Sequence, residues 1–133
     1  MLRKVAIGAA LISFGLVGGL SAQLVPPPGG IKRTLLQKVD VPGTNYEVIL
    51  GMAEVAAGKS SGRHTHPGPE TGTVLEGEAV LLVDGQPETT LKPGDSYQIA
   101  PETIHDVRTG AHAAKVIAIY VVPKGQPIAT PAK

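Results

Sequence analysis

Hydrophobic and polar positions alternate over short stretches along most of this chain, a pattern typical of β-strands. Tyr46 to Ala57 alternates imperfectly, which predicts a long strand partly covered on both faces. Lys115 to Val122 is almost continuously apolar and predicts a strand inside the core. After the N-terminal segment no stretch keeps a helical period over three turns. The pattern therefore predicts an all-β domain, either a sandwich or a small barrel.

Turn residues separate the other predicted strands. Asp84 and Gly85 are a strong hairpin signal, and Gly77 marks a turn or bulge. The further strands are predicted at residues 35–40, 71–76, 78–83, 88–91, 96–100 and 104–108. Sheet edges remain in such a fold, which favours a homodimer that pairs or covers them.

The N-terminal segment changes the picture of where the domain resides. Residues 1–22 begin with Arg3 and Lys4, continue with an apolar run and end on small residues, which predicts a secretory signal peptide cleaved after Ala22. The alternative is an uncleaved N-terminal anchor. We therefore expect a periplasmic or secreted protein, and the absence of cysteine is compatible with an oxidising compartment.

The predicted domain organisation follows from these segments. Residues 23–34 contain three consecutive prolines and a Gly-Gly pair, which predicts an extended arm. Residues 35–122 hold the predicted β domain, and residues 123–133 lack a pattern that could bury itself, which predicts a disordered tail.

Charge excludes one class of partner. The chain has twelve Lys and Arg and eleven Asp and Glu. Removing residues 1–22 takes away two basic residues and no acidic one, so the net charge becomes −1. A nearly neutral domain without a basic run lacks the footprint of a nucleic-acid-binding protein.

Candidate chemistry is concentrated in four side chains. His64 and His66 are two residues apart, so on a strand both project to the same face. Glu70 follows closely, and His105 comes from a distant strand. Three imidazoles and a carboxylate suit a divalent transition metal such as iron, manganese, nickel, zinc or copper. His112 lies in a Gly/Ala turn and is predicted to be a surface histidine.

The residues around these histidines resemble the first motif of the cupin family. That motif is G(x)5HxH(x)3–4E(x)6G, and the stretch from Gly58 to Gly77 matches it at every fixed position. The second cupin motif, G(x)5PxG(x)2H(x)3N, is matched at Gly94 and His105. Three positions depart from it: Ala100 replaces the proline, Glu102 the glycine and Thr109 the asparagine.

The resemblance covers about residues 45–122 and implies a jelly-roll barrel. It also implies that His64, His66, Glu70 and His105 are metal ligands. The tract HTHPGPETGTVLEGE is similar to single-domain secreted cupins of the quercetin dioxygenase-like type. Because the family holds enzymes and binding proteins of many kinds, the resemblance alone assigns no substrate.

Further polar residues are candidates for a role near this site. Glu102 is a candidate general base or partner of a ligand, with a surface role as the alternative. Tyr97 is a second catalytic candidate, although parity does not decide whether Tyr97 or Gln98 faces the interior. Arg63 and Arg108 could receive an anionic substrate, but cross-strand charge pairing is the favoured interpretation.

Two functional hypotheses remain open at this level. The first is an exported metal-dependent oxidoreductase, dioxygenase-like, that acts on a small organic substrate. The second is a non-catalytic cupin that binds a small molecule or a metal. A structural dimer without chemistry is disfavoured because the ligand set is intact.

Overall fold

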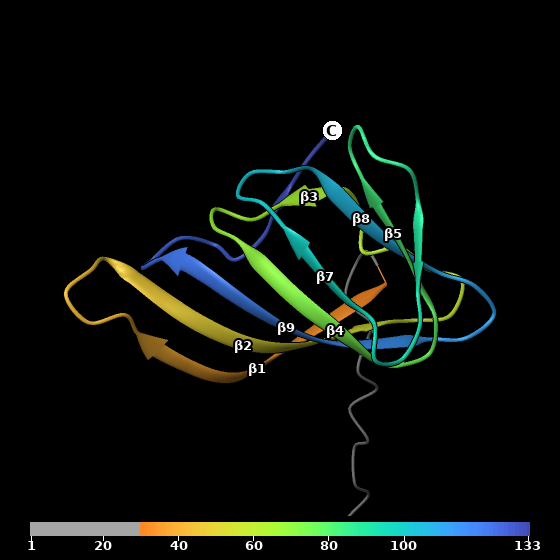
Figure 1. The fold of residues 1–133 in the computed structure, drawn as a ribbon, viewed down its shortest axis with the longest axis horizontal. Helices are drawn as coiled ribbons and strands as arrows, with labels where there is room; N and C mark the ends of the chain where they lie inside the picture. The colour runs from red at the N-terminus through yellow and green to blue at the C-terminus, as the bar shows by residue number, and fades with distance from the viewer. Residues whose placement is uncertain (1–29) are drawn as a thin grey trace, which may run out of the picture.

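The computed structural model describes residues 30–133, which fold into two antiparallel sheets of five strands each. Figure 1 shows the two sheets facing each other, with one hairpin extending beyond the barrel. The predicted signal peptide at residues 1–22 and most of the predicted arm lie outside the described residues. The all-β prediction is confirmed, and the jelly-roll arrangement matches the resemblance. Within residues 30–133 no helix is long and apolar enough to cross a membrane.

The larger sheet has the order β1-β2-β9-β4-β7. Its long centre is the pairing of β2 with β9, which runs in continuous register from Tyr46 opposite Pro123 to Val55 opposite Ala114. The strands of this sheet are β1 (Ile31–Asp40), β2 (Tyr46–Val55), β9 (Ala114–Pro123), β4 (Glu70–Glu76) and β7 (Ser96–Ile99).

The smaller sheet has the order β10-β3-β8-β5-β6. Its strands are short, and β3 meets β8 through a single residue pair, His64 opposite His105. The strands of this sheet are β10 (Thr130–Pro131), β3 (His64–Thr65), β8 (His105–Thr109), β5 (Ala79–Val83) and β6 (Thr89–Leu91).

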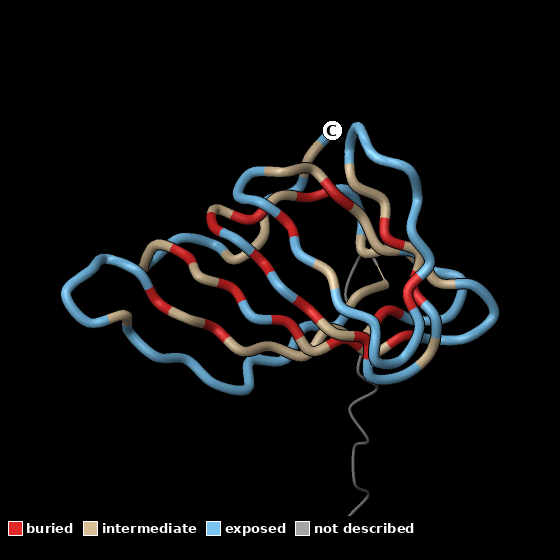
Figure 2. Tube along the Cα trace, viewed as in Figure 1, coloured by how far each residue is buried: buried red, intermediate tan, exposed pale blue. Residues whose placement is uncertain are grey.

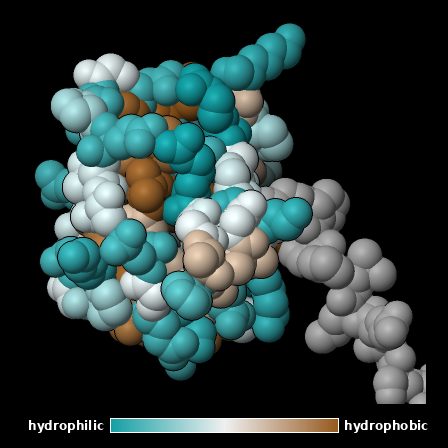
Figure 3. All heavy atoms as spheres, turned by 90° about the vertical axis from the view of Figure 1, so that its right-hand side faces the viewer, coloured by the Kyte–Doolittle hydropathy of each residue, from teal (hydrophilic) through white to brown (hydrophobic). Residues whose placement is uncertain are grey.

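Alternating burial places the core between the sheets. In β9, every second residue from Ala114 to Val122 is buried, as expected where one face of a strand covers a core. Figure 2 shows the same alternation along the neighbouring strands of the larger sheet. Figure 3 shows that the face on the right of Figure 1 is mostly hydrophilic, with hydrophobic atoms in its centre. Apolar side chains therefore converge inside the barrel.

Two predicted boundaries differ from the structure. β1 begins at Ile31, so residues 31–34 belong to a strand and not to the predicted arm at 23–34. The segment 123–133, predicted to be disordered, contains β10, whose Thr130 pairs with Thr65. Both segments are ordered by pairing with a distant strand, and their own sequence carries no sign of that partner.

Two residues with positive φ, Gly77 and Glu102, lie where the chain turns between strands. Gly77 has a φ of 74° after a register shift between Val74 and Glu76, as its predicted turn or bulge requires. An added Cβ at Gly77 would lie 2.1 Å from the carbonyl oxygen of Ala113. Glu102 has a φ of 57°, a left-handed conformation that glycine adopts more easily. The corner therefore keeps its shape although the second cupin motif has glycine there.

Candidate metal centre

Three histidines meet inside the barrel because β3 and β8 are adjacent. His64 and His105 are paired across these strands, and His66 lies two residues after His64 on the same face. Each side chain is buried, and one ring nitrogen from each lies within 4.8 Å of the others. Glu70, the first residue of β4, reaches the same point from the larger sheet. The structure thus brings together the four residues that the sequence singled out.

The tautomer of each histidine is set by a backbone carbonyl. Nδ1 of His64 lies 2.7 Å from the carbonyl oxygen of Gly62. Nδ1 of His66 lies 2.5 Å from the carbonyl oxygen of Ile128, and Nδ1 of His105 lies 2.9 Å from that of Thr103. A carbonyl oxygen only accepts hydrogen bonds, so each Nδ1 must donate. In the neutral rings every Nε2 therefore carries a lone pair, as a metal ligand does.

Glu70 faces those lone pairs. Its Oε2 lies 2.9 Å from Nε2 of His66 and 3.4 Å from Nε2 of His105. Oε2 and the His66 Nε2 are nevertheless buried without a hydrogen bond, so the 2.9 Å contact joins two acceptors when the rings are neutral. Buried lone pairs that face each other repel unless a cation lies between them. A divalent metal would satisfy both atoms.

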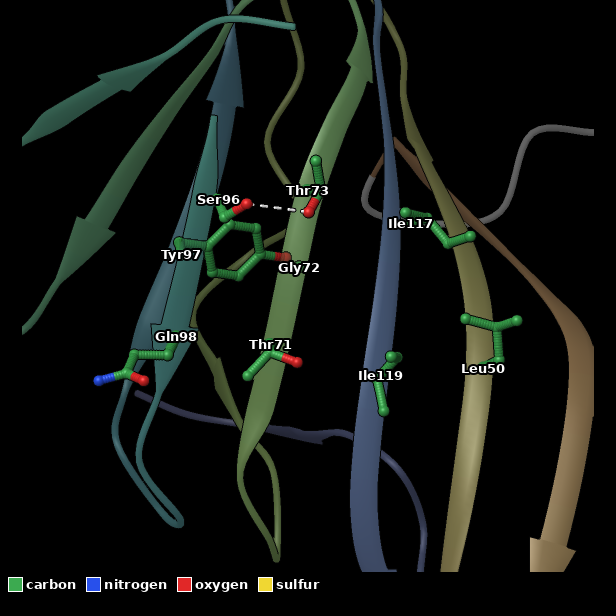
Figure 4. A pocket seen from close by; sticks show the side chains of 9 residues that line it. All are labelled: Leu50, Thr71, Gly72, Thr73, Ser96, Tyr97, Gln98, Ile117 and Ile119. Carbon is green, nitrogen blue, oxygen red and sulfur yellow. Dashed lines mark hydrogen bonds between the residues drawn. The ribbon is translucent and has the colours of Figure 1, made fainter. Parts of the chain in front are cut away.

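Tyr97 holds the other carboxylate oxygen. Its hydroxyl donates to Oε1 of Glu70 at 2.7 Å, which leaves Oε2 directed at the histidines. The ring passes over Gly72, where an added Cβ would lie 2.5 Å from the Tyr97 hydroxyl. Tyr97 therefore faces the interior, whereas Gln98 lines the outer face of the sheet (Figure 4).

Burial and neighbouring charge set the protonation states. Burial, helped by the nearby His105, His66 and Arg33 and opposed by the Gly62 carbonyl, lowers the pKa of His64 to about 4. Burial acts to raise the pKa of Glu70, but the His105 and His66 rings, wherever one is protonated on Nε2, and the hydrogen bond from the Tyr97 hydroxyl outweigh it and hold the pKa below its usual range. Burial, together with Glu70, raises the pKa of Tyr97. At neutral pH His64 is therefore neutral and Glu70 ionised, as metal ligation requires.

The space beside these donors is small. A cavity of about 20 Å³ is bounded by His64, Glu70 and His105, and one water molecule needs roughly 10–15 Å³ by the same kind of measure. Two tyrosines, Arg33, Ser61 and aliphatic side chains complete its wall. In this conformation the cavity has room for an ion or a water molecule. A larger organic ligand would have to extend through its mouth.

A larger hollow of about 570 Å³ lies on the outer face of the larger sheet. Figure 4 shows Leu50, Ile117 and Ile119 on one side of it, and a hydrogen bond between Thr73 and Ser96 on the other. It contains no histidine or carboxylate. The candidate metal-binding groups therefore line the small interior cavity and not this larger hollow.

The remaining predicted candidates lie away from the cavity. Glu102 is exposed and does not line it, so its placement gives no support to a role as base. Arg63 pairs with Asp84 at 2.7 Å and Arg108 with Glu88 at 2.6 Å, which confirms charge pairing for both. His112 is exposed, as expected.

Sequence reasoning missed two contributors. Arg33 of β1 places Nη2 3.4 Å from Nε2 of His64, although its segment was predicted to be an arm. Asp106 accepts hydrogen bonds from Ser60 and Ser61, which ties the loop before His64 to β8. The position of Asp106 directly after a candidate ligand was the one available signal. Arg33 had none.

A comparison with protein-family models shows which family this chain belongs to. The model described as Cupin domain matches residues 51–122, which include all four converging side chains. The chain belongs to the cupin family. A comparison with curated proteins found no match to this cupin.

Solved structures show the same fold. The cupin resembles DMSP lyase DddQ from Ruegeria pomeroyi, with 21% identity, TM-score 0.65, and 77% of this chain and 51% of that chain covered. It also resembles oxalate oxidase in complex with glycolate, with 23% identity, TM-score 0.61, and 78% of this chain and 56% of that chain covered. A third similar structure is an uncharacterised protein with a double-stranded β-helix domain from Klebsiella pneumoniae, with 24% identity, TM-score 0.63, and 81% of this chain and 89% of that chain covered. This cupin spans about half the length of the lyase and oxidase chains.

Proposed function

We propose that this cupin binds one divalent transition metal through His64, His66, His105 and Glu70 and acts as a metal-dependent enzyme on a small organic substrate. The observation that carries the proposal is the buried contact between Nε2 of His66 and Oε2 of Glu70, two atoms without a hydrogen bond. A bound metal of this class supplies Lewis acidity and, for a redox-active ion, electron transfer.

The chain's own residues prepare the site for that chemistry. Backbone carbonyls hold the three imidazoles with Nε2 directed inward, and Tyr97 orients the carboxylate of Glu70. Four protein ligands leave positions open on a six-coordinate ion, which suits a catalytic site better than a structural one. Burial excludes bulk water, so the charge of Glu70 acts strongly inside the cavity.

The reaction type is proposed from the resemblance at sequence level: a dioxygenase-like oxidoreductase of the quercetin dioxygenase-like type. The structural relatives include a lyase and an oxidase by name, so they favour an enzyme that acts on a small molecule without selecting one reaction. Oxygen uptake by the metal-loaded cupin with flavonols, catechols and diketones tests this choice.

A non-catalytic binding cupin is the second candidate. The observation in its favour is the cavity of about 20 Å³, in which Glu70 is the one carboxylate. Absence of turnover with every metal, despite stoichiometric binding, would favour this candidate over an enzyme.

The metal assignment is tested by alanine substitution. We expect His64→Ala and His105→Ala each to abolish stoichiometric metal in protein purified from its host, because each removes one Nε2 donor from the cluster. His112→Ala is the matched control and should keep full occupancy, since His112 is exposed and distant from the cavity. Elemental analysis measures all three, and equal loss in all three variants would contradict the assignment.

We also propose that the chain is exported and forms a homodimer. The basic, apolar and small-residue order of residues 1–22 supports export. Determination of the N-terminal residue of the protein isolated from its host tests cleavage after Ala22. The exposed edge strand β1 supports the dimer.

A further inference from the structure

One basic side chain at the cavity has no role in the proposed ligand set. Arg33 is opposite Ala53 in the register of β1 and β2, and opposite residues of antiparallel strands share a face. Both residues line the cavity, and the Arg33 guanidinium contacts His64 at 3.4 Å. Arg33 lines the cavity and is also exposed as a residue, so its side chain lies between the interior donors and solvent.

Arg33 has no carboxylate partner among residues 30–133, which include all eleven acidic residues of the chain. The basic residues beside it on β1 are paired: Lys32 with Glu54 and Lys38 with Glu47. A guanidinium carries five N–H donors, so Arg33 keeps donors for a ligand.

Metal binding would remove the His64 acceptor that Arg33 contacts. The lone pair on Nε2 of His64 would be shared with the metal and could no longer accept a hydrogen bond from Arg33. With neutral histidines, the site would carry +1 from Arg33, +2 from a divalent metal and −1 from Glu70, which leaves +2. An excess of positive charge at a partly buried site is costly unless an anion compensates it.

The shape of the cavity limits that anion. A volume of about 20 Å³ is too small for a whole organic anion, so most of such a ligand would extend outward past Arg33. A carboxylate has the right form, because a guanidinium binds it through two parallel hydrogen bonds. Apolar neighbours such as Ile31 and Val107 would contact its carbon atoms.

We infer that Arg33 binds the carboxylate of a small organic acid beside the metal ligands, and that this residue restricts the substrates of the site to such anions. The inference rests on the proposed function, because the charge excess exists only with a metal bound. It assigns Arg33 a role in substrate binding and specificity.

The test uses the whole protein loaded with cobalt(II), whose visible absorption reports changes around the ion. Acetate is the probe, and acetamide is its uncharged isostere. We expect acetate to shift the spectrum with saturation and acetamide to bind at least about tenfold more weakly, because the guanidinium recognises charge.

Three variants locate the effect. Arg33→Met should keep cobalt stoichiometry and lose about tenfold or more in acetate affinity. Arg33→Lys should be intermediate, since it keeps the charge without the planar fork. Arg63→Met is the matched control, because Arg63 is exposed and paired with Asp84, and its acetate affinity should equal that of the wild type.

The outcomes separate the two levels of the proposal. Cobalt binding with unchanged acetate affinity in both Arg33 variants, or with no acetate binding by the wild type, overturns the inference and leaves the metal site standing. Failure of the wild type to bind cobalt or any other divalent transition metal overturns the proposed function itself. Circular dichroism checks the fold of each variant, and if Arg33→Met does not fold, the lysine variant decides.

Discussion

At the scale of single residues, the carbonyl beside each Nδ1 fixes the tautomer of the histidine, so that Nε2 keeps its lone pair for a metal. Gly62, Thr103 and Ile128 contribute main-chain oxygens, so the ring orientation does not depend on the side chains at these positions. Glu70 differs, because a side chain orients it. The Tyr97 hydroxyl is therefore the contact within the site that substitution reaches most directly.

Removing this hydroxyl should weaken metal binding. We expect Tyr97→Phe to lower metal affinity about tenfold, the lower end of the range for lost partners of metal ligands, because Oε1 of Glu70 would lose its donor. Competition with a chromophoric chelator measures the affinity. Tyr46→Phe is the control, since Tyr46 is exposed on the surface. Equal affinity in the wild type and the Tyr97 variant would show that Glu70 needs no such support.

At the scale of elements, short strands of the smaller sheet present the histidines and long strands of the larger sheet support them. β3 contains two residues and is held by β8 on one side and β10 on the other. Next to β8, the corner at Glu102 donates its backbone N–H to the carbonyl oxygen of His66 at 2.9 Å. The backbone of Glu102 thus positions His66, a candidate ligand, although the Glu102 side chain does not line the cavity.

Glu102 should carry a backbone cost at this corner. A left-handed conformation costs a non-glycine residue roughly 1–2 kcal/mol, and glycine loses about 0.5–1 kcal/mol through its freer unfolded chain. We therefore expect Glu102→Gly to stabilise the domain by about 0.5–1 kcal/mol, with a Tm a few degrees higher. Glu102→Val, β-branched, should lower the Tm.

Thermal unfolding of metal-free protein measures both variants at Glu102. A shift in the same direction for glycine and valine would rule out the backbone conformation as the cause. Metal stoichiometry should be unchanged in the folded variants, because the Glu102 side chain does not reach the cavity.

At the scale of the whole molecule, the proposed metal ligands come from both sheets. His64 and His105 belong to the smaller sheet and Glu70 to the larger one, so a bound ion would join the two layers at one end of the core. The hairpin of β1 and β2 extends beyond the barrel in Figure 1. Its edge strand exposes Leu35 and Val39, each 61% accessible.

Those two side chains lead to a prediction about assembly. A ten-residue edge strand with exposed apolar side chains favours pairing with or covering by a second copy. We expect the protein to sediment as a dimer and the double variant Leu35→Glu, Val39→Glu to sediment as a monomer, because charges would enter the contact. Leu75→Glu is the control, since Leu75 is an exposed leucine on β4. A monomeric wild type at micromolar concentration would contradict the dimer.

The sequence by itself determined the class of fold and the composition of the site. Alternation with a period of two and turn residues are local signals, so they located the strand that carries His105 and, from residue 71 onward, the strand that begins at Glu70. The motif spacing also indicated that the four side chains converge. Gly77 was visible as a turn for the same local reason.

Only the tertiary structure decided which distant segments complete the site. Arg33 reaches His64 across 31 positions, and the carbonyl of Ile128 reaches His66 across 62. Both lie in segments that the sequence alone predicted to be an arm and a disordered tail. A strand's partner is chosen by register and burial across the whole barrel, and no local pattern of hydrophobic and polar residues encodes that choice.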